Sequence, residues 1–220
     1  MLADGSYVIF SDFDGTIIQQ DSTDTMVRIY GSELNKQDEL LFIEGKVSNR
    51  ETMQRHFRTM RLPLEQYFGV LHSMTLDPTF KKFYNKMKPL GLTFSVLTGN
   101  TAEGVRLYLA KNGFNDVSVY GNKLQIENGA VVFISEDQVG ETLCKKGSCA
   151  FCKAARLEGA KKLGKKVVYI GDGHTDICAA AHADLLFAKG VLAEWCEKNN
   201  TAFQRFESFE DIYRFFFGEE

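Results

Sequence analysis

Residues 7–16 read YVIFSDFDGT, an apolar run that ends in two acids placed one residue apart. The apolar part, residues 7–10, predicts a short buried strand because it is rich in β-branched and aromatic residues and is bounded by glycines. Asp12 and Asp14 then lie at the carboxyl end of that strand, where open parallel sheets bind ligands. Two such carboxylates repel each other unless a cation such as Mg²⁺ offsets their charge. The stretch predicts a magnesium site, with an Asp-rich turn as the alternative.

Beyond residue 88, short apolar runs alternate with helical patterns, which is typical of α/β proteins with a doubly wound, Rossmann-like parallel sheet. Further strands are expected at 93–97, 117–120, 167–170, 185–188 and 202–206, and a hairpin at 124–126 and 130–134 around an Asn-Gly turn. Helices are expected at 101–112, 151–163, 176–182, 191–198 and 209–217, and a helix at 79–88 is expected just before the strand 93–97.

Residues 17–88 break this alternation, because their apolar residues recur at helical spacing and no convincing strand appears among them. We expect four or five helices here, separated at Gly31, Gly45 and Pro63. The pattern predicts two domains: an α/β core made of residues 1–16 and 89–220, and a helical segment, 17–88, inserted after the first strand.

Composition narrows the class of protein. The 220 residues are 44% hydrophobic and 25% charged, with a formal net charge of −3, so no nucleic-acid partner is expected. No apolar stretch approaches the roughly 18 residues needed to span a bilayer, and no leader pattern is present, so we expect no membrane partner and a cytoplasmic location. Five cysteines, an odd number, fit reduced thiols better than a disulfide framework. The oligomeric state is left open.

Three further signals follow predicted strands. Thr98-Gly99 comes after the strand 93–97 and is expected to open a helix, where a hydroxyl and backbone N–H groups form an anion site; an ordinary N-cap is the alternative. Lys153 precedes a helix and could place a positive charge on a phosphate. Asp172 and Asp176 follow the strand 167–170, and for Asp176 a capping role is the alternative.

Taken in order, these motifs resemble those of the haloacid dehalogenase-like phosphatase superfamily, and the resemblance covers nearly the whole chain. It implies that Asp12 is the nucleophile and that Asp14 is the general acid and base. It also implies that Mg²⁺ is held by Asp12, Asp172 and the main-chain carbonyl of Asp14. Asp176 is implied to contact a metal-bound water or Lys153 and not the metal itself. The residues implied to hold the phosphoryl oxygens are Thr98, Gly99 and Lys153.

The helical segment 17–88 matches the position of the family's cap, which closes over the site and selects the substrate. The layout resembles the phosphoserine phosphatase-like branch, and more closely the branch containing 2-hydroxy-3-keto-5-methylthiopentenyl-1-phosphate phosphatase of methionine salvage. Asp21 lies near the position of a substrate-binding cap acid. Gln54 replaces the arginine that would bind the carboxylate of phosphoserine, with Arg55 beside it. Arg55 is therefore a candidate substrate contact, and a solvated helix face is the alternative.

The expected function is a Mg²⁺-dependent phosphatase acting on a small phosphorylated metabolite through an aspartyl phosphate. Phosphoserine phosphatase or phosphotransferase activity is an alternative, and so is a phosphate-binding regulatory protein without catalysis. The spacing of Cys144, Cys149 and Cys152 could also supply three ligands of a zinc site, with Cys178, Cys196 or His182 as a remote fourth. Reduced thiols are the simpler interpretation of these cysteines.

Overall fold

The computed structural model of the protein describes residues 6–135 and 149–218, which form two compact units. Among these residues, unit 1 comprises 6–19, 75–97 and 153–218, and unit 2 comprises 20–74, 98–135 and 149–152. The boundaries differ from the expected domains, because unit 2 joins the helical segment to the later hairpin. Whether residues 17–88 act as a cap stays a prediction.

The described strands form one sheet in the order β4-β3-β2-β1-β5-β6-β7. The strands are β1 (Tyr7–Ser11), β2 (Thr93–Thr101), β3 (Ser118–Glu127), β4 (Ala130–Ile134), β5 (Lys166–Gly171), β6 (Leu185–Ala188) and β7 (Gln204–Arg205). β1 pairs in parallel with β2 and β5, and the β5–β6 and β6–β7 pairs are also parallel. The β3–β4 hairpin is antiparallel. The predicted α/β fold class is confirmed.

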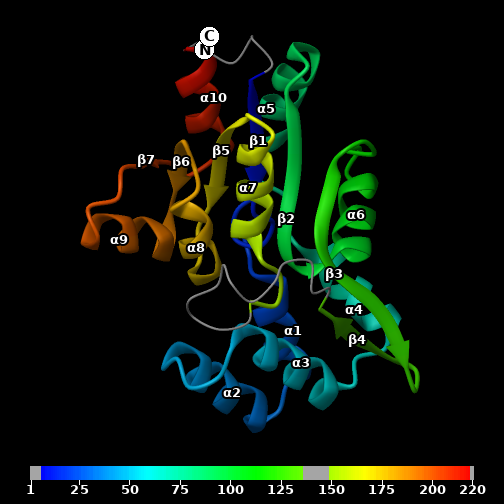
Figure 1. Cartoon of the computed structure of the whole chain (residues 1–220). Helices are drawn as coiled ribbons and strands as arrows, with labels where there is room; N and C mark the ends of the chain where they lie inside the picture. Colours follow the sequence, from blue (N-terminus) through cyan, green and yellow to red (C-terminus); the bar gives the residue numbers. More distant parts are fainter. Residues whose placement is uncertain (1–5, 136–148, 219–220) are drawn as a thin grey trace. The chain divides into compact units, whose positions relative to one another are not determined.

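The helices, labelled in Figure 1, lie close to the ranges expected from the sequence. They are α1 (Ser22–Tyr30), α2 (Glu33–Ile43), α3 (Asn49–Met60), α4 (Leu64–Ser73), α5 (Phe80–Met87), α6 (Ala102–Lys111), α7 (Lys153–Lys162), α8 (Ile177–Ala180), α9 (Gly190–Lys198) and α10 (Phe209–Phe217). Single 3₁₀ turns cover Lys88–Leu90 and His174–Asp176.

Unit 1 is built on the central strand β1. Ile9 pairs with Phe94 of β2 on one side and with Val168 of β5 on the other, and Ile9 and Val168 are fully buried. Helix α5 also belongs to this unit, because Phe80 packs against Phe209 of α10 with ring centroids 4.9 Å apart. The sequence placed α5 at the end of the helical segment; its aromatic face instead covers the core of unit 1.

Unit 2 combines helices α1–α4 and α6 with the β3–β4 hairpin. Phe57 of α3 packs against Phe133 of β4 with ring centroids 4.0 Å apart. The backbone N–H of Val131 donates to the carbonyl of Leu62 at 2.8 Å. These contacts explain why the hairpin groups with the helical segment: the helices bury their apolar faces against it.

Two local expectations about strand ends were wrong. β2 continues to Thr101, so Thr98 and Gly99 lie within the strand and do not open a helix. Helix α6 begins at Ala102, where the Thr101 side chain accepts a hydrogen bond from the backbone N–H of Gly104 at 3.1 Å. The better N-cap therefore lies three residues later than expected. The two strands expected within 117–126 also form one continuous strand, β3.

The Asn-Gly turn is confirmed. Asn128 and Gly129 have φ values of +50° and +77°, which is the left-handed pair that a tight hairpin turn requires.

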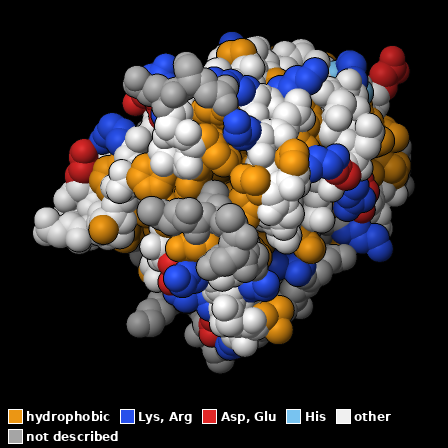
Figure 2. Space-filling model, turned by 90° about the horizontal axis from the view of Figure 1, so that it is seen from above, with side chains coloured by type: hydrophobic (Ala, Val, Ile, Leu, Met, Phe, Trp, Pro, Cys, Tyr) orange, Lys and Arg blue, Asp and Glu red, His pale blue; other side chains and the backbone are white. Residues whose placement is uncertain are grey.

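Charged side chains are dispersed on the surface shown in Figure 2, where Lys and Arg lie among apolar and neutral groups without forming one continuous basic area. No helix within residues 6–135 and 149–218 has both the length and the apolar character needed to cross a membrane.

Candidate active site

Asp12 lies where β1 leaves the sheet of unit 1. Its backbone N–H donates to the carbonyl of Ile170 in β5 at 2.8 Å, so the pairing of the two strands continues one residue beyond Ser11. Its Oδ1 accepts a hydrogen bond from the N–H of Phe13 at 2.7 Å. The residue is 6% exposed, so its carboxylate is buried and is held by the N–H of Phe13.

Lys153, the first residue of α7, joins two of the acids in this unit. Its Nζ lies 2.7 Å from Asp12 Oδ2 and 2.7 Å from Asp176 Oδ1, and the lysine is 3% exposed. A further hydrogen bond to the Thr175 hydroxyl measures 3.3 Å. A buried ammonium needs this many partners, because desolvation without them would cost several kcal/mol.

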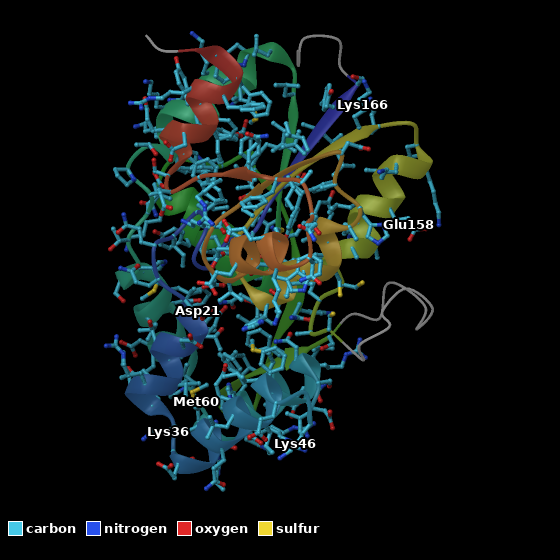
Figure 3. The ribbon with its side chains drawn as sticks, turned by 90° about the vertical axis from the view of Figure 1, so that its left-hand side faces the viewer. Asp21, Lys36, Lys46, Met60, Glu158 and Lys166 are labelled. Carbon is cyan, nitrogen blue, oxygen red and sulfur yellow. The ribbon has the colours of Figure 1, made fainter. Side chains whose placement is uncertain are left out.

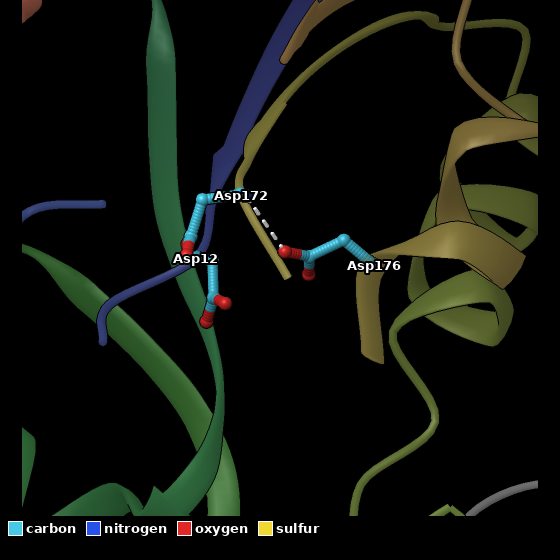
Figure 4. A group of neighbouring side chains, drawn as sticks. All are labelled: Asp12, Asp172 and Asp176. Carbon is cyan, nitrogen blue, oxygen red and sulfur yellow. Dashed lines mark hydrogen bonds between the residues drawn. The ribbon is translucent and has the colours of Figure 1, made fainter. Parts of the chain in front are cut away.

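Asp176 is held on all sides. Its Oδ1 accepts from Lys153 and from the Tyr169 hydroxyl, and its Oδ2 accepts from the backbone N–H groups of Asp172 and Gly173 at 2.9 and 3.0 Å. The bond to the Asp172 backbone is the dashed line in Figure 4. With its lone pairs occupied in this way, Asp176 positions Lys153 and the turn after β5 and is a poor first ligand for a cation.

Asp172 is tied to the turn that follows β1. Thr16 Oγ1 donates to Asp172 Oδ1 at 2.6 Å. Gly15, between Asp14 and Thr16, has φ +69°, and a Cβ there would lie 2.3 Å from Asp172 Oδ2. Only glycine fits this position, since any side chain would be strained and would collide with the carboxylate. The glycine of the first motif thus lets the turn approach Asp172 closely.

Asp12, Lys153, Asp172 and Asp176 together form what we call the acid–lysine cluster. Burial raises the pKa of Asp12 well above its usual value, and the charge of Asp176 adds to this effect. Burial and the same neighbour raise the pKa of Asp172 to about 6. Burial alone would raise the pKa of Asp176 as well, but the Lys153 ammonium lowers it overall. Three carboxylates thus share one ammonium, which leaves uncompensated negative charge.

This donor set fits a divalent cation. Carboxylate oxygens of Asp12, Asp172 and Asp176 lie within 4.8 Å of one another, as Figure 4 illustrates. Within residues 6–135 and 149–218, no other group of three or more His, Cys, Asp or Glu side chains meets that condition. Oxygen donors and excess negative charge favour a hard ion such as Mg²⁺.

A comparison with known protein families identifies the family of this chain. Residues 9–181 match the model of the haloacid dehalogenase-like hydrolases. The chain belongs to this family. The match runs from β1 to the end of α8 and contains every residue of the acid–lysine cluster, so the predicted family is confirmed.

Curated relatives of this haloacid dehalogenase-like hydrolase include named phosphatases. Polyol phosphate phosphatase PYP1 of Saccharomyces cerevisiae is 26% identical over 222 residues, covering 93% of this chain and 90% of that protein. The 2-hydroxy-3-keto-5-methylthiopentenyl-1-phosphate phosphatase of Brevibacillus brevis is 25% identical, covering 94% and 93%. Pdp3-interacting factor 1 of Schizosaccharomyces pombe is 28% identical, covering 94% and 93%.

Solved structures support the fold. A substrate-bound phosphoserine phosphatase superposes on the hydrolase with a TM-score of 0.70 at 22% identity, covering 94% of this chain and 97% of the other. At that identity the likeness concerns the fold alone.

The structure brings four predicted site residues of the hydrolase together in unit 1, namely the acid–lysine cluster. Asp14 follows Asp12 by two residues and is half-buried. Sequence reasoning missed Thr16 and Tyr169, which bind Asp172 and Asp176. Thr16 belongs to the first motif and could have been singled out there. Tyr169 looked like an ordinary apolar strand residue, so nothing local marked it.

The remaining candidates of the hydrolase lie in unit 2. Thr98 is fully buried in β2. Asp21 is the N-cap of α1, where its side chain accepts from the N–H of Asp24 at 2.9 Å (Figure 3). Arg55 forms an ion pair with Asp38 at 2.9 Å on the surface of α2 and α3. Each side chain thus has a local structural role, and the substrate-binding roles of these residues and of Gly99 stay predictions.

The zinc hypothesis stays a prediction, because Cys144 lies outside the described residues. Cys149 and Cys152, which are described, are not part of any group of three candidate ligands found in residues 6–135 and 149–218.

Proposed function

We propose that this hydrolase is a cytoplasmic Mg²⁺-dependent phosphatase that cleaves a small phosphorylated metabolite through an aspartyl phosphate on Asp12. The observation that carries the proposal is the position of Asp12: a buried carboxylate at the end of β1, 2.7 Å from Lys153 and next to Asp172. The family match and the named phosphatases among the relatives point to the same chemistry. The odd cysteine count fits a reducing compartment.

Asp12 and Asp172, with the main-chain carbonyl of Asp14, would hold the Mg²⁺. When bound, the ion neutralises the carboxylates and the charge of the phosphoryl oxygens. Lys153 provides positive charge beside the attacking carboxylate. Asp176 fixes Lys153 and, through the N–H groups of Asp172 and Gly173, the turn that carries Asp172.

The reaction proceeds in two displacements. One carboxylate oxygen of Asp12 attacks phosphorus while the bond to the ester oxygen breaks, and the carboxylic acid of Asp14 gives its proton to that leaving oxygen. A water then attacks the same phosphorus, and the carboxylate of Asp14 takes its proton. The bond between phosphorus and Asp12 breaks, which releases inorganic phosphate and regenerates both side chains.

The proposal is tested with Asp12→Asn. We expect turnover of a generic aryl phosphate with Mg²⁺ to fall at least about 10³-fold, because an amide cannot form the acyl phosphate. Asp184→Asn is the matched control: Asp184 is a carboxylate of the same unit that is paired with Lys161 on the surface, and its loss should leave turnover unchanged. A folded Asp12→Asn variant within tenfold of wild type would show that Asp12 is not the nucleophile.

Three measurements separate the alternatives. EDTA abolishes turnover in a Mg²⁺-dependent enzyme, whereas a regulatory phosphate-binding protein shows none under any condition. Added alcohols yield phosphorylated products only if phosphotransfer competes with hydrolysis. Assays with a panel of polyol phosphates, phosphoserine and 2-hydroxy-3-keto-5-methylthiopentenyl-1-phosphate rank the substrates. The names of the relatives suggest the first and last of these compounds. A preference for the last would support a role in methionine salvage.

We further propose that the helical segment 17–88, apart from α5, which belongs to unit 1, is a mobile cap that selects the leaving group, with Arg55 and Asp21 as its polar contacts. Arg55→Ala should weaken transition-state binding of the best panel substrate by about 1–3 kcal/mol, measured as the fall in kcat/KM. The kcat/KM for a small aryl phosphate should fall far less.

The matched control for Arg55 is Asp38→Asn, which removes the ion-pair partner and keeps the guanidinium. If the structural ion pair alone matters, the two variants behave alike. Equal loss on both substrates, or no loss on either, would exclude Arg55 from substrate recognition.

A further inference from the structure

Asn122 of β3 is an unusual buried residue in unit 2. It is 1% exposed, and its Nδ2 donates to the backbone carbonyl of Gly99 at 2.7 Å. Its Oδ1 is buried and has no hydrogen-bond partner among the residues that the structure describes. Leaving a buried polar atom without a partner destabilises the folded state, because the atom has lost its bond to water and gained none in return. An apolar side chain of similar size would avoid this cost but would also take the Nδ2 donor away from the Gly99 carbonyl, so what asparagine adds at this position is the hydrogen bond to that carbonyl.

The carbonyl that Asn122 binds belongs to the peptide unit between Gly99 and Asn100. The N–H of the same peptide unit donates to Thr98 Oγ1 at 2.9 Å. Both polar groups of this peptide are therefore bound, one by Asn122 and one by the Thr98 hydroxyl, and the plane of the peptide is fixed. Asn122 reaches Thr98 through this single rigid group.

Close approach of β3 makes this arrangement possible. A Cβ on Gly121 would lie 2.7 Å from the Asn100 carbonyl oxygen and 2.8 Å from Thr98 Cγ2. A side chain at position 121 would thus push β3 away from the end of β2 and lift Asn122 off the Gly99 carbonyl.

The bond from Asn100 determines what the Thr98 hydroxyl can do. A hydroxyl has one hydrogen to donate and two lone pairs that accept. Because Thr98 Oγ1 accepts the N–H of Asn100, its hydrogen points away from that bond and stays available to a ligand. This is the polarity needed to bind a phosphoryl oxygen, which only accepts hydrogen bonds.

A second set of contacts holds Asn100 itself from the helices. Asn100 Oδ1 accepts from the Tyr67 hydroxyl at 2.6 Å and from the N–H of Thr101 at 2.7 Å, and its Nδ2 donates to Ser22 Oγ at 2.8 Å. These bonds fix the side chain of Asn100, whereas Asn122 binds the Gly99 carbonyl. We call the set Ser22, Tyr67, Thr98, Asn100, Thr101 and Asn122 the neutral network.

We propose that Asn122 is a positioning residue: it holds the Gly99–Asn100 peptide so that the Thr98 hydroxyl donates its hydrogen to the phosphoryl group in the transition state. This inference rests on the proposed phosphatase function. It explains why an asparagine with an unsatisfied oxygen occupies a buried position on β3. It also gives Thr98 a phosphate-binding role that needs no helix N-terminus, in keeping with its place inside β2.

The test is a double-mutant cycle made of Asn122→Leu, Thr98→Val and the double variant, assayed for kcat and KM on an aryl phosphate at saturating Mg²⁺. We expect Thr98→Val to lower kcat about 100-fold, as for loss of one transition-state donor. Asn122→Leu should lower kcat about tenfold, as for a supporting contact. In the Thr98→Val background, Asn122→Leu should cost less than twofold, because its effect passes through the missing hydroxyl.

Asn122→Asp distinguishes positioning from packing. A protonated carboxyl can donate to the Gly99 carbonyl, whereas a carboxylate repels it, so activity relative to wild type should fall as pH rises. Gln125→Leu, an exposed position of the same strand, is the matched control and should behave as wild type. Asn122→Leu removes the unsatisfied oxygen and also the donor to the Gly99 carbonyl; these two effects on stability oppose each other, so thermal melts should show only a small net change.

Two outcomes would overturn the inference. One is a folded Asn122→Leu variant whose kcat lies within twofold of wild type. The other is an unchanged loss in the Thr98→Val background, which would mean that Asn122 acts by another route. If Asn122→Leu fails to fold, the pH profile of Asn122→Asp decides, and a flat ratio to wild type refutes positioning. A turnover-competent Asp12→Asn would instead refute the proposed function, so the two failures are distinguishable.

Discussion

Unit 1 and unit 2 each bury a connected set of polar side chains, but the chemistry of the two sets differs. The acid–lysine cluster of unit 1 crowds three carboxylates around one ammonium, and burial raises the pKa of both Asp12 and Asp172. The neutral network of unit 2 contains only hydroxyls and amides. A buried charge is costly unless it is paired, whereas a bonded neutral group costs little.

The two sets of polar side chains have different effects on the stability of the fold. Excess charge in the acid–lysine cluster works against folding, so its retention points to chemistry. The neutral network holds backbone geometry, and most of its polar atoms are hydrogen-bonded; Asn122 Oδ1 has no partner among the described residues, and the hydrogen of the Thr98 hydroxyl is the one we assign to a ligand. Substitutions should therefore change the free energy of unfolding in opposite directions. Removing a carboxylate from the acid–lysine cluster can stabilise the fold, whereas removing a hydroxyl from the neutral network should destabilise it.

The largest expected effect comes from Lys153→Met. Without the ammonium, the carboxylates of Asp12 and Asp176 stay buried with no compensating charge, so we expect the free energy of unfolding in EDTA to fall by about 3–5 kcal/mol. Lys161→Met, on the same helix, is the matched control. Lys161 pairs with Asp184 at the surface, and such pairs contribute about 0–1 kcal/mol. Urea denaturation giving equal losses for the two variants would remove the contrast between buried and surface charge.

Asp172→Asn should sharpen the contrast with an effect of intermediate size. The pKa of Asp172 rises from 3.8 to about 6 on folding, so ionisation costs the folded state, and wild-type stability in EDTA falls as pH rises through this interval. The variant lacks this loss and should be more stable at pH 7.5, by about 1–3 kcal/mol. The bond from Thr16 to Oδ1 can be kept. Thermal melts between pH 4 and 7.5 measure the difference.

The same variant should raise the Mg²⁺ concentration for half-maximal activity about tenfold or more, since one charged ligand is lost. Asp184→Asn is the control for stability, because folding shifts the pKa of Asp184 in the opposite direction to that of Asp172. Burial alone would raise the pKa of Asp184, but the N–H of Val167 and the Lys161 ammonium lower it overall, so its removal should not stabilise the protein. An Asp172→Asn variant with wild-type Mg²⁺ dependence would exclude Asp172 as a ligand.

Tyr67→Phe probes the other side of the comparison and should have the smallest effect. The hydroxyl contacts Asn100 Oδ1 at 2.6 Å and Thr101 Oγ1 at 2.8 Å, so its loss should destabilise by about 1–2 kcal/mol. Tyr108→Phe, which removes one bond to the Met74 carbonyl in the same unit, should cost about half as much. If Tyr67→Phe stabilised the protein, the neutral network could not be a geometric support for the end of β2.

The sequence by itself determined the elements that depend on neighbours along the chain. The apolar run 7–10 followed by acids fixed β1 and the place of Asp12, and alternation of strand and helix patterns fixed the α/β class. The Asn128-Gly129 turn was readable because the left-handed backbone favours those two residues. The family followed from the same local motifs, which carry glycines and acids at set spacings.

Only the tertiary structure decided which distant residues meet. Thr16 bonds to Asp172 across 156 positions of sequence, and Tyr169 reaches Asp176 only because the turn after β5 folds back over the strand. The length of β2, the packing of α5 with α10 and the bond from Asn122 to Gly99 likewise depend on strand register and on which apolar faces find each other. These choices are made by long-range packing, because local propensity is a weak preference that burial against a partner overrides.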